Sequence, residues 1–328
     1  MKSVWFWIST FTIALIIFAG LCWLGMRPDQ TLHHAVVIGN VKLIKDQLAA
    51  GSDINASDKE GLTPLMRAVL AGQPACMDLL LASGADINRA GQNGNTALHF
   101  AAMQKNPAAA ERLIAVGADF QLHNSQNATP LCLAIQAGNP VVEKLVSAGA
   151  LTNNLSCAHE NYLFCAARVG NIAMLEILIK HGQDLNFRSA SGACALHHAI
   201  IRGHAEVVRL LLDRDVNLNW QDRYGLTPLR YAVRGNRPDI VKLLLDHGAN
   251  MELRDNQDRT PLLMTAQLGF VEIFELLVRR GANIDAKLSS GETALDLARV
   301  NNHQKIVDFL ADYRRELEAR RLDSTMQF

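Results

Sequence analysis

The hexapeptide Thr96-Ala97-Leu98-His99-Phe100-Ala101 returns in variant form along most of the chain. The other copies begin at Gln30, Thr63, Thr129, Asn161, Cys194, Thr227, Thr260 and Thr293. Consecutive starts differ by 33, 33, 33, 32, 33, 33, 33 and 33 residues. Nine copies at this spacing indicate a repeat architecture, in which each unit buries its apolar face against its neighbours.

Each copy carries the signals of two short helices. Thr63 followed by Pro64 is a helix start, because the hydroxyl caps free N–H groups and proline fits the first turn. The first helix is expected to end at Gly72. A second helix with the leucine ridge Leu79-Leu80-Leu81 is expected to end at Gly84. The pattern therefore predicts a helix–turn–helix unit, followed by a polar turn that leads into the next copy.

These motifs resemble the ankyrin-repeat family. Thr96 to Ala101 and Cys194-Ala195-Leu196-His197-His198-Ala199 are similar to its T-P-L-H-x-A signature, and Gly84-Ala85-Asp86-Ile87-Asn88 is similar to its closing loop. The resemblance covers about residues 30–313. It implies an all-α ankyrin-repeat solenoid with β-turn fingers on one side. It also implies a non-catalytic protein that binds partner proteins through the finger tips and the inner face of the first helices.

Some copies depart from the pattern. The step from the fourth to the fifth copy is one residue short, and the fifth copy, at Asn161, lacks the Thr-Pro start. We expect a weaker cap and a local change of curvature there. The last helix is expected to run past Leu310 into charged residues. The predicted domains are an anchor at 1–26, a repeat domain at 27–313 and a charged helical cap and tail at 314–328.

The N-terminal segment has the character of a membrane span. Residues 4–26 contain no Asp, Glu, Lys, Arg or His, and as a helix they would be about 34 Å long. Trp5 and Trp7 lie at one end and Trp23 at the other, where indoles favour the lipid–water boundary. We therefore expect a single-pass transmembrane helix. A cleaved signal sequence, a lipoprotein modified at Cys22 and a buried soluble helix remain alternatives.

Two observations disagree about the side of the membrane that holds the repeats. The amino terminus and Lys2 outnumber Arg27 by about one charge, which favours an exported repeat domain. Five cysteines outside the span show no evident pairing, which does not resemble an exported disulfide scaffold. We give the charge rule slightly more weight, and the cytoplasmic side remains open.

Composition and motifs argue against several function classes. The chain has 328 residues, with 32 basic and 32 acidic side chains, and this balance argues against nucleic-acid binding. Phosphate-binding, dinucleotide-binding, HExxH and GxSxG motifs do not occur, so we expect no catalytic residue, cofactor or small-molecule substrate. The sulfur–nitrogen cluster of Cys157, His159 and Cys165 lacks a CxxC pair, so no metal site is expected either. His33, His99 and His197 occupy the signature position, where the family uses histidine structurally.

Partner-binding residues are expected at exposed finger tips and at the inner ends of the first helices. The candidates are Lys59, Glu60, Gln92, Asn93, Gln126, Arg168, Arg202, Arg223, Tyr224, Arg234, Asn256 and Gln257. Arg168, Arg202 and Arg234 follow successive repeat starts by seven or eight residues, so they should form a stripe below the finger that carries Tyr224. We hypothesise that this stripe docks an acidic patch of a partner. The alternative is a solvated row of cations near helix C-termini.

The sequence thus predicts a membrane-anchored interaction scaffold. An immunity-type or inhibitory protein that occludes an enzyme in its own compartment is the alternative, and it rests on analogy alone.

Overall fold

The computed structural model describes residues 31–151 and 161–325, and the structural statements below concern these residues. The predicted anchor at residues 4–26 lies outside them, as do Cys157 and His159.

The described residues form short helices in pairs, which confirms the predicted all-α stack of helix–turn–helix units. The first helices of the pairs are α2 (Leu32–Val37), α4 (Pro64–Leu70), α6 (Ala97–Met103), α8 (Pro130–Gln136), α10 (Tyr162–Val169), α12 (Ala195–Arg202), α14 (Pro228–Arg234), α16 (Pro261–Leu268) and α18 (Ala294–Val300). The second helices are α3 (Val41–Ala49), α5 (Pro74–Ala82), α7 (Pro107–Ala115), α9 (Val141–Ser147), α11 (Ile172–Lys180), α13 (Ala205–Leu212), α15 (Pro238–Asp246), α17 (Val271–Arg279) and α19 (Gln304–Thr325).

The helices begin as the Thr-Pro motif predicts. The hydroxyls of Thr63, Thr129 and Thr227 each accept a hydrogen bond from the backbone N–H three residues later. In the first copy the cap is Thr31, so α2 begins one residue later than the copy start at residue 30 would give. In the fifth copy Asn161 caps α10 through its side chain, so the missing threonine does not leave this helix uncapped.

The predicted end of the first helices is also observed. Gly170 and Gly203 adopt the left-handed conformation at the ends of α10 and α12, and Asn236 and Asn302 adopt it where asparagine fills the same position. The third copy places Lys105 there, with a φ of 56°. A non-glycine residue in this conformation costs about 1–2 kcal/mol, so this position is satisfied less well than its equivalents.

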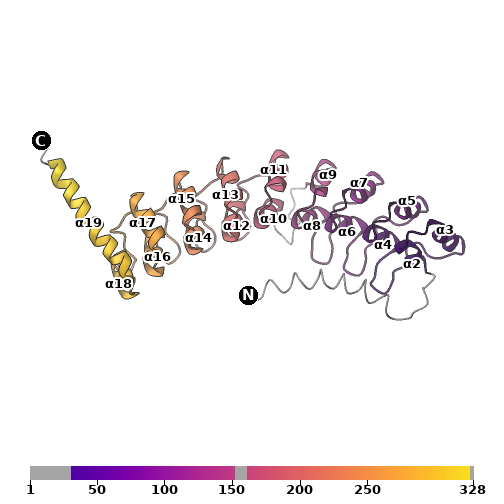
Figure 1. Ribbon diagram of the computed structural model, residues 1–328, viewed down its shortest axis with the longest axis horizontal. Helices are drawn as coiled ribbons and strands as arrows, with labels where there is room; N and C mark the ends of the chain where they lie inside the picture. Colours follow the sequence, from indigo (N-terminus) through magenta and orange to yellow (C-terminus); the bar gives the residue numbers. More distant parts are fainter. Residues whose placement is uncertain (1–30, 152–160, 326–328) are drawn as a thin grey trace. The chain divides into compact units, whose positions relative to one another are not determined.

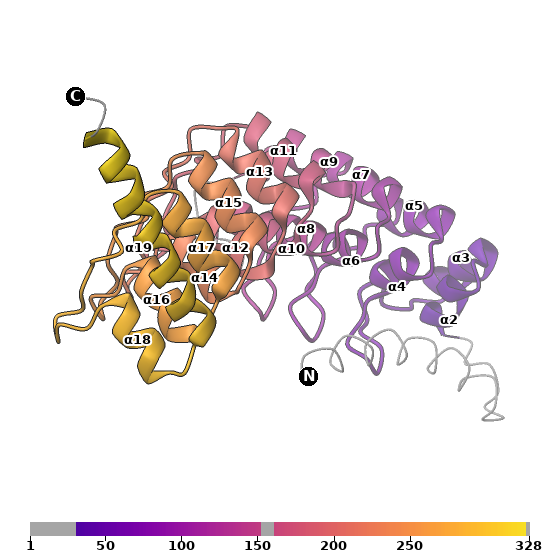
Figure 2. The same ribbon diagram turned by 60° about the vertical axis from the view of Figure 1, so that its left-hand side comes forward.

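Contacts divide the chain into two compact units, Met1–Phe100 and Ala101–Phe328. The division falls within α6 and not at the shortened step between the fourth and fifth copies. In the described part of the first unit, α2 packs on α4 and α3 packs on α5. In the second unit, the first helices α8 to α18 form one layer and the second helices from α7 onward form the other (Figures 1 and 2).

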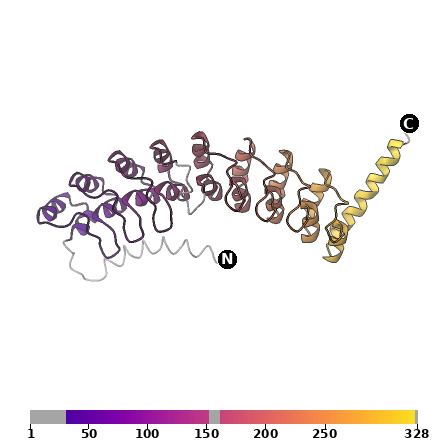
Figure 3. The same cartoon turned by 180° about the vertical axis from the view of Figure 1, so that it is seen from behind.

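Side chains in the connecting loops fix the register between successive repeats of the second unit. Asn186 Oδ1 accepts a hydrogen bond of 2.8 Å from the backbone N–H of Asn217. Asn219 repeats the contact with Asn250 at 2.9 Å, one repeat further along. The two layers therefore advance together, as the reverse view of Figure 3 also shows.

The last helix closes the second unit and continues past Leu310, as predicted. The ring of Phe309 packs edge-on against Phe274 at 6.1 Å between centroids and stacks on Tyr313. From Arg314 to Ala319 the helix is exposed. Between residues 31 and 151 and between 161 and 325, no helix combines the length and the apolar character that a membrane span requires.

The cysteines depart from expectation. Cys76, Cys165 and Cys194 are buried free thiols, whereas Cys132 is disulfide-bonded. The sequence showed no evident pairing among these cysteines, so the pairing of Cys132 was not predicted.

Candidate functional site

The predicted finger-tip residues are exposed, but the two compact units divide them. Lys59, Glu60, Gln92 and Asn93 belong to the first unit, and the remaining tips belong to the second. Glu60 is also engaged within its own repeat, because its carboxylate lies 3.0 Å from the guanidinium of Arg67.

In the second unit neighbouring finger tips contact each other. The backbone N–H of Asn256 donates to the carbonyl of Tyr224 at 3.2 Å, and its side-chain amide donates to the carbonyl of Arg223 at 2.9 Å. The guanidinium of Arg223 lies over the Tyr224 ring at 5.2 Å. The predicted residues Arg223, Tyr224 and Asn256 are thus brought together at one place, with Gln257 beside them.

The three predicted arginines lie in the last turns of α10, α12 and α14, as their spacing required. Arg202 and Arg234 end their helices and are exposed, and neither forms an ion pair with another residue in the described ranges. Arg168 differs, because it is half-buried and its guanidinium approaches Cys165 Sγ at 4.0 Å. Arg202 and Arg234 are therefore the cations of the stripe that a partner can reach most easily.

Tyr231 connects the finger tip with the arginine stripe, and the sequence analysis missed it. Its hydroxyl donates to Asp222 Oδ2 at 2.6 Å. Burial, the hydrogen bond to Asp222 and the charge of Asp222 raise the pKa of Tyr231 to about 12, while nearby Arg234 opposes this shift. Tyr224 also contributes to this electrostatic environment. The half-buried Tyr231 is thus close enough to Arg234 and Tyr224 for both to influence its pKa.

Side chains near the base of the fingers join consecutive fingers in the second unit. The Arg188 guanidinium donates to the carbonyl of Gln221 at 2.7 Å, Gln221 donates to Arg254 O at 2.7 Å, and Arg254 donates to Lys287 O at 2.8 Å. Each also binds a carbonyl of its own finger, as Gln221 does with Gly225 at 3.0 Å. We call Arg188, Gln221 and Arg254 the finger staples. They hold four successive fingers in register.

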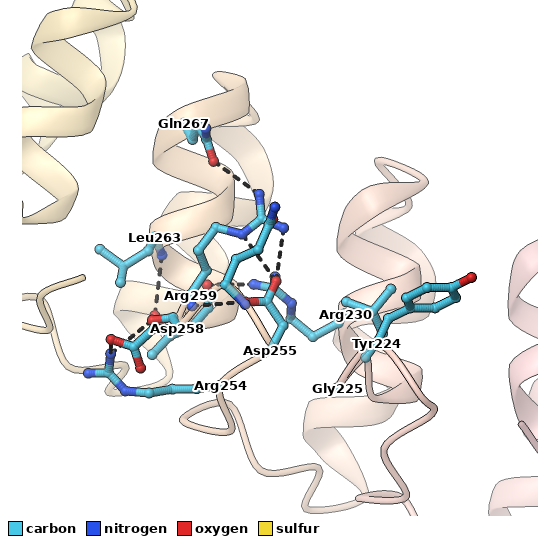
Figure 4. A network of polar contacts seen from close by, with 12 residues as sticks. Tyr224, Gly225, Arg230, Arg254, Asp255, Asp258, Arg259, Leu263 and Gln267 are labelled. Atoms are coloured by element: carbon cyan, nitrogen blue, oxygen red, sulfur yellow. Dashed lines mark hydrogen bonds and ion pairs between the residues drawn. The ribbon is translucent and has the colours of Figure 1, made fainter. Parts of the chain in front are cut away.

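A buried ion-pair network links Asp255 to Arg230 on helix α14 (Figure 4). The side chain of Arg230 is completely buried and pairs with the carboxylate of Asp255, which Arg259 also binds at 2.9 Å. Arg230 further donates to the carbonyl of Thr260 at 2.7 Å, and Arg259 donates to Gln267 Oε1 at 3.2 Å. Burial lowers the pKa of Arg230 to about 10, against the opposing effect of Asp255, so the guanidinium remains charged at neutral pH.

The other oxygen of Asp255 shapes the finger itself. Asp255 Oδ1 accepts hydrogen bonds of 2.9 Å from the backbone N–H groups of Gln257 and Arg259. Asn124 forms the equivalent pair of hydrogen bonds in the fourth copy. One carboxylate therefore closes a turn with one oxygen and compensates a buried charge with the other.

Comparison with known proteins identifies the repeats. A family model described as ankyrin repeats in three copies matches residues 32–124, 101–189, 163–255 and 250–321. The chain belongs to the ankyrin-repeat family. A Fowlpox virus (strain NVSL) protein named as an ankyrin repeat protein is 48% identical over 46 residues, or 14% of this chain. The chain spans about one third of the length of that relative, 33%.

Ankyrin repeats imply a protein-binding scaffold, and proteins with such repeats are typically non-catalytic. The histidines fit this structural use. His197 Nδ1 accepts the backbone N–H of Cys194 at 3.2 Å, and Nε2 donates to the carbonyl of Leu226 at 3.4 Å in the next repeat. Burial lowers the pKa of His197 to about 4, so the imidazole is neutral at neutral pH. His99 makes the same contact with Thr96.

The signature position also shows how the buried Arg230 could have been predicted from the sequence. Arg230 follows Thr227-Pro228-Leu229, where the ankyrin signature has histidine. A cation in a position that is normally buried signals a compensating carboxylate, but the sequence did not say which one. In the described parts of the chain, no group of three or more His, Cys, Asp or Glu side chains could hold a metal ion.

Proposed function

We propose that this ankyrin-repeat protein is a membrane-anchored scaffold that binds an acidic surface of a partner protein through its second unit. The observation that carries the proposal is the set formed by Tyr224, Tyr231, Arg234 and Arg202. Tyrosine and arginine are the residues most often found at the energetic centres of protein interfaces. Here the Tyr224 ring is exposed, and the exposed guanidinium groups of Arg202 and Arg234 form no ion pair with another described residue.

The surrounding structure supports recognition without large rearrangement. The finger staples and the hydrogen bonds between neighbouring tips order the backbone on which Arg223 and Tyr224 stand. Binding residues on an ordered framework lose less conformational entropy when a partner docks. The exposed ring and guanidinium groups are therefore already close to the positions they would occupy in a complex.

Charge reversal tests the proposal. The full-length chain is crosslinked in its native membrane and the partner is identified, after which capture is measured for a double variant with Arg202→Glu and Arg234→Glu. We expect capture to fall at least tenfold, because both cations would repel an acidic partner. The matched control carries Arg209→Glu and Lys242→Glu, exposed cations on the second helices α13 and α15 of the same repeats.

Unchanged capture by the Arg202 and Arg234 double variant, with an unaltered thermal midpoint, would refute the proposed surface. If the captured partner is an enzyme that loses its activity in a one-to-one complex, the scaffold acts as an inhibitor, which is the alternative that the sequence analysis left open.

The membrane anchor is part of the same proposal. It is supported by the uncharged run at residues 4–26 and its flanking tryptophans. The disulfide at Cys132 supports an exported repeat domain, because disulfides persist mainly in oxidising compartments.

A further inference from the structure

Four exposed apolar side chains of the second unit lie at two neighbouring positions, seven or eight residues after the starts of their copies. In the last turn or at the end of the first helices, Val169 is 37% exposed, Ile201 48%, Leu268 43% and Val300 78%. Such side chains are normal when they are scattered singly over a surface, but a periodic row requires a reason.

Two cations lie in the middle of this set of apolar residues. Arg202 directly follows Ile201, and Arg234 occupies the last position of α14, between the helices that carry Ile201 and Leu268. We call the set Val169, Ile201, Arg202, Arg234, Leu268 and Val300 the last-turn strip. It combines apolar area with positive charge along one edge of the first-helix layer.

Contacts between repeats keep this edge continuous. His204 Nε2 donates to the carbonyl of Arg168 in the last turn of α10 at 3.0 Å, and His303 Nε2 donates to that of Gln267 in α16 at 3.1 Å. The first helices of adjacent repeats also pack directly on each other from α10 to α18. The strip residues therefore advance by one helix spacing, about 8–10 Å, per repeat.

We propose that the last-turn strip binds an extended acidic segment of a partner protein that carries an apolar side chain at every third position. Polyproline II conformation rises about 3.1 Å per residue and has three residues per turn, so it places every third side chain on one face at intervals of about 9 Å. That interval matches the spacing of neighbouring first helices. This inference rests on the proposed protein-binding function and specifies the chemistry of the partner.

The charges near the strip favour a narrow segment over an anionic membrane surface. Glu206, Asp239 and Glu272 are exposed in the first turns of the second helices α13, α15 and α17, which begin three or four residues after the strip positions. A broad anionic surface would contact these carboxylates and be repelled. A single chain that follows the row of Arg202 and Arg234 can avoid them.

Peptide binding to the full-length chain tests the inference. The probe is a fluorescein-labelled peptide of about 18 residues built from Glu-Pro-Leu triplets, long enough to span roughly 50 Å in polyproline II conformation. Two comparison peptides replace leucine by serine or glutamate by lysine. Fluorescence anisotropy should give a dissociation constant for the Glu-Pro-Leu peptide about tenfold below either comparison peptide.

Variants then locate the binding. Ile201→Ser together with Leu268→Ser should remove the preference for leucine over serine, and both side chains are exposed enough for the fold to persist. The matched control is Val116→Ser, an exposed apolar residue outside the strip, 56% exposed, which should keep the preference. Thermal midpoints confirm that all variants are folded.

Equal binding of the leucine and serine peptides would overturn the inference. The inference would also be overturned if Ile201 and Leu268 were needed for binding to vesicles of anionic phosphatidylserine but not for the preference between the peptides. Partner capture that depends on Arg202 and Arg234 but not on Ile201 and Leu268 would overturn this inference and leave the proposed function standing. Partner capture that depends neither on Arg202 and Arg234 nor on Ile201 and Leu268 would refute both the proposed function and this inference.

Discussion

Arg230 and Asp255 form the most consequential residue-level contact in the chain. A buried ion pair gains its attraction only by losing hydration, so its net contribution to stability is modest. Removing one partner is different, because the remaining charge stays buried without compensation. Burial alone would raise the pKa of Asp255, but hydrogen bonds from Arg259 and the two guanidinium charges lower it below its usual value. The carboxylate therefore stays ionised, which a buried Arg230 requires.

Asp255→Asn should lower the free energy of unfolding by about 3 kcal/mol, because it removes the charge that compensates Arg230. The turn itself should survive, since Asn124 holds the equivalent turn in the fourth copy. The measurement is urea denaturation at pH 7. Asp222→Asn is the control, because Asp222 closes its finger in the same way but accepts a hydrogen bond from the uncharged Tyr231 hydroxyl. Its replacement leaves no buried charge uncompensated and should cost about 1.5 kcal/mol. Equal losses in the two variants would show that the charge of Asp255 is not decisive.

His197 should make stability depend on pH. Its pKa is about 4 in the folded protein, against 6.5 for the free side chain, because burial disfavours the charged form. The unfolded chain therefore binds more protons between these values, and the stabilisation present above pH 6.5 is lost as the pH falls towards 4. Between pH 7 and pH 5 this amounts to about 2 kcal/mol.

The variant His197→Met isolates that effect, because Met66 occupies the same position in the second copy and contacts the backbone N–H of Thr63. Urea denaturation of the variant should lose about 2 kcal/mol less than the natural chain between pH 7 and pH 5. Identical pH dependence of the two chains would mean that other groups account for the titration.

At the scale of elements, the finger staples should determine how rigid the fingers are. Gln221→Ala removes hydrogen bonds to Gly225 O and Arg254 O, and we expect a loss of about 1–2 kcal/mol in local stability. Amide hydrogen exchange should accelerate in residues 222–226. Gln257→Ala, at an exposed finger tip, serves as the control and should leave amide exchange in residues 222–226 unchanged. Equal acceleration in both variants would argue that the staples do not stabilise the fingers.

The elements were largely predictable from sequence because their signals are local. Thr63 and its equivalents cap helices through contacts three residues away, and Gly203 or Asn236 ends them through its own backbone conformation. The site was less predictable. Tyr231 lies near Tyr224 and Arg234 through packing that the sequence does not show, and the partner of Arg230 lies 25 residues away, in the finger that leads into the next copy. Such contacts depend on repeat packing, which no short motif encodes.

At the scale of the whole molecule, the ankyrin repeats imply a protein that acts through what it binds, and the proposed anchor adds where it is held. The second unit supplies the proposed binding surface. Residues 4–26 would supply the location, and the two properties are separable because they involve different segments of the chain. A soluble stack with the same surface would meet a different set of partners, so the proposed anchor would contribute to specificity together with the proposed arginine stripe.

Extraction with alkaline carbonate tests the anchor. We expect the full-length chain to remain with the membrane pellet, because about 20 apolar residues suffice to span the hydrocarbon core. A variant with Ala14→Arg and Ile17→Arg should be released to the supernatant, since each arginine at the centre of a span costs about 2.5–3.5 kcal/mol. Conservative changes at the same two positions, Ala14→Leu and Ile17→Leu, should leave the chain in the pellet.

Protease added to sealed spheroplasts should then digest the repeats if they are exported, and alkylation under non-reducing conditions should find Cys132 blocked. Release of the full-length chain by carbonate would show that residues 4–26 do not anchor it, whereas protected repeats with an alkylated Cys132 would place them on the cytoplasmic side.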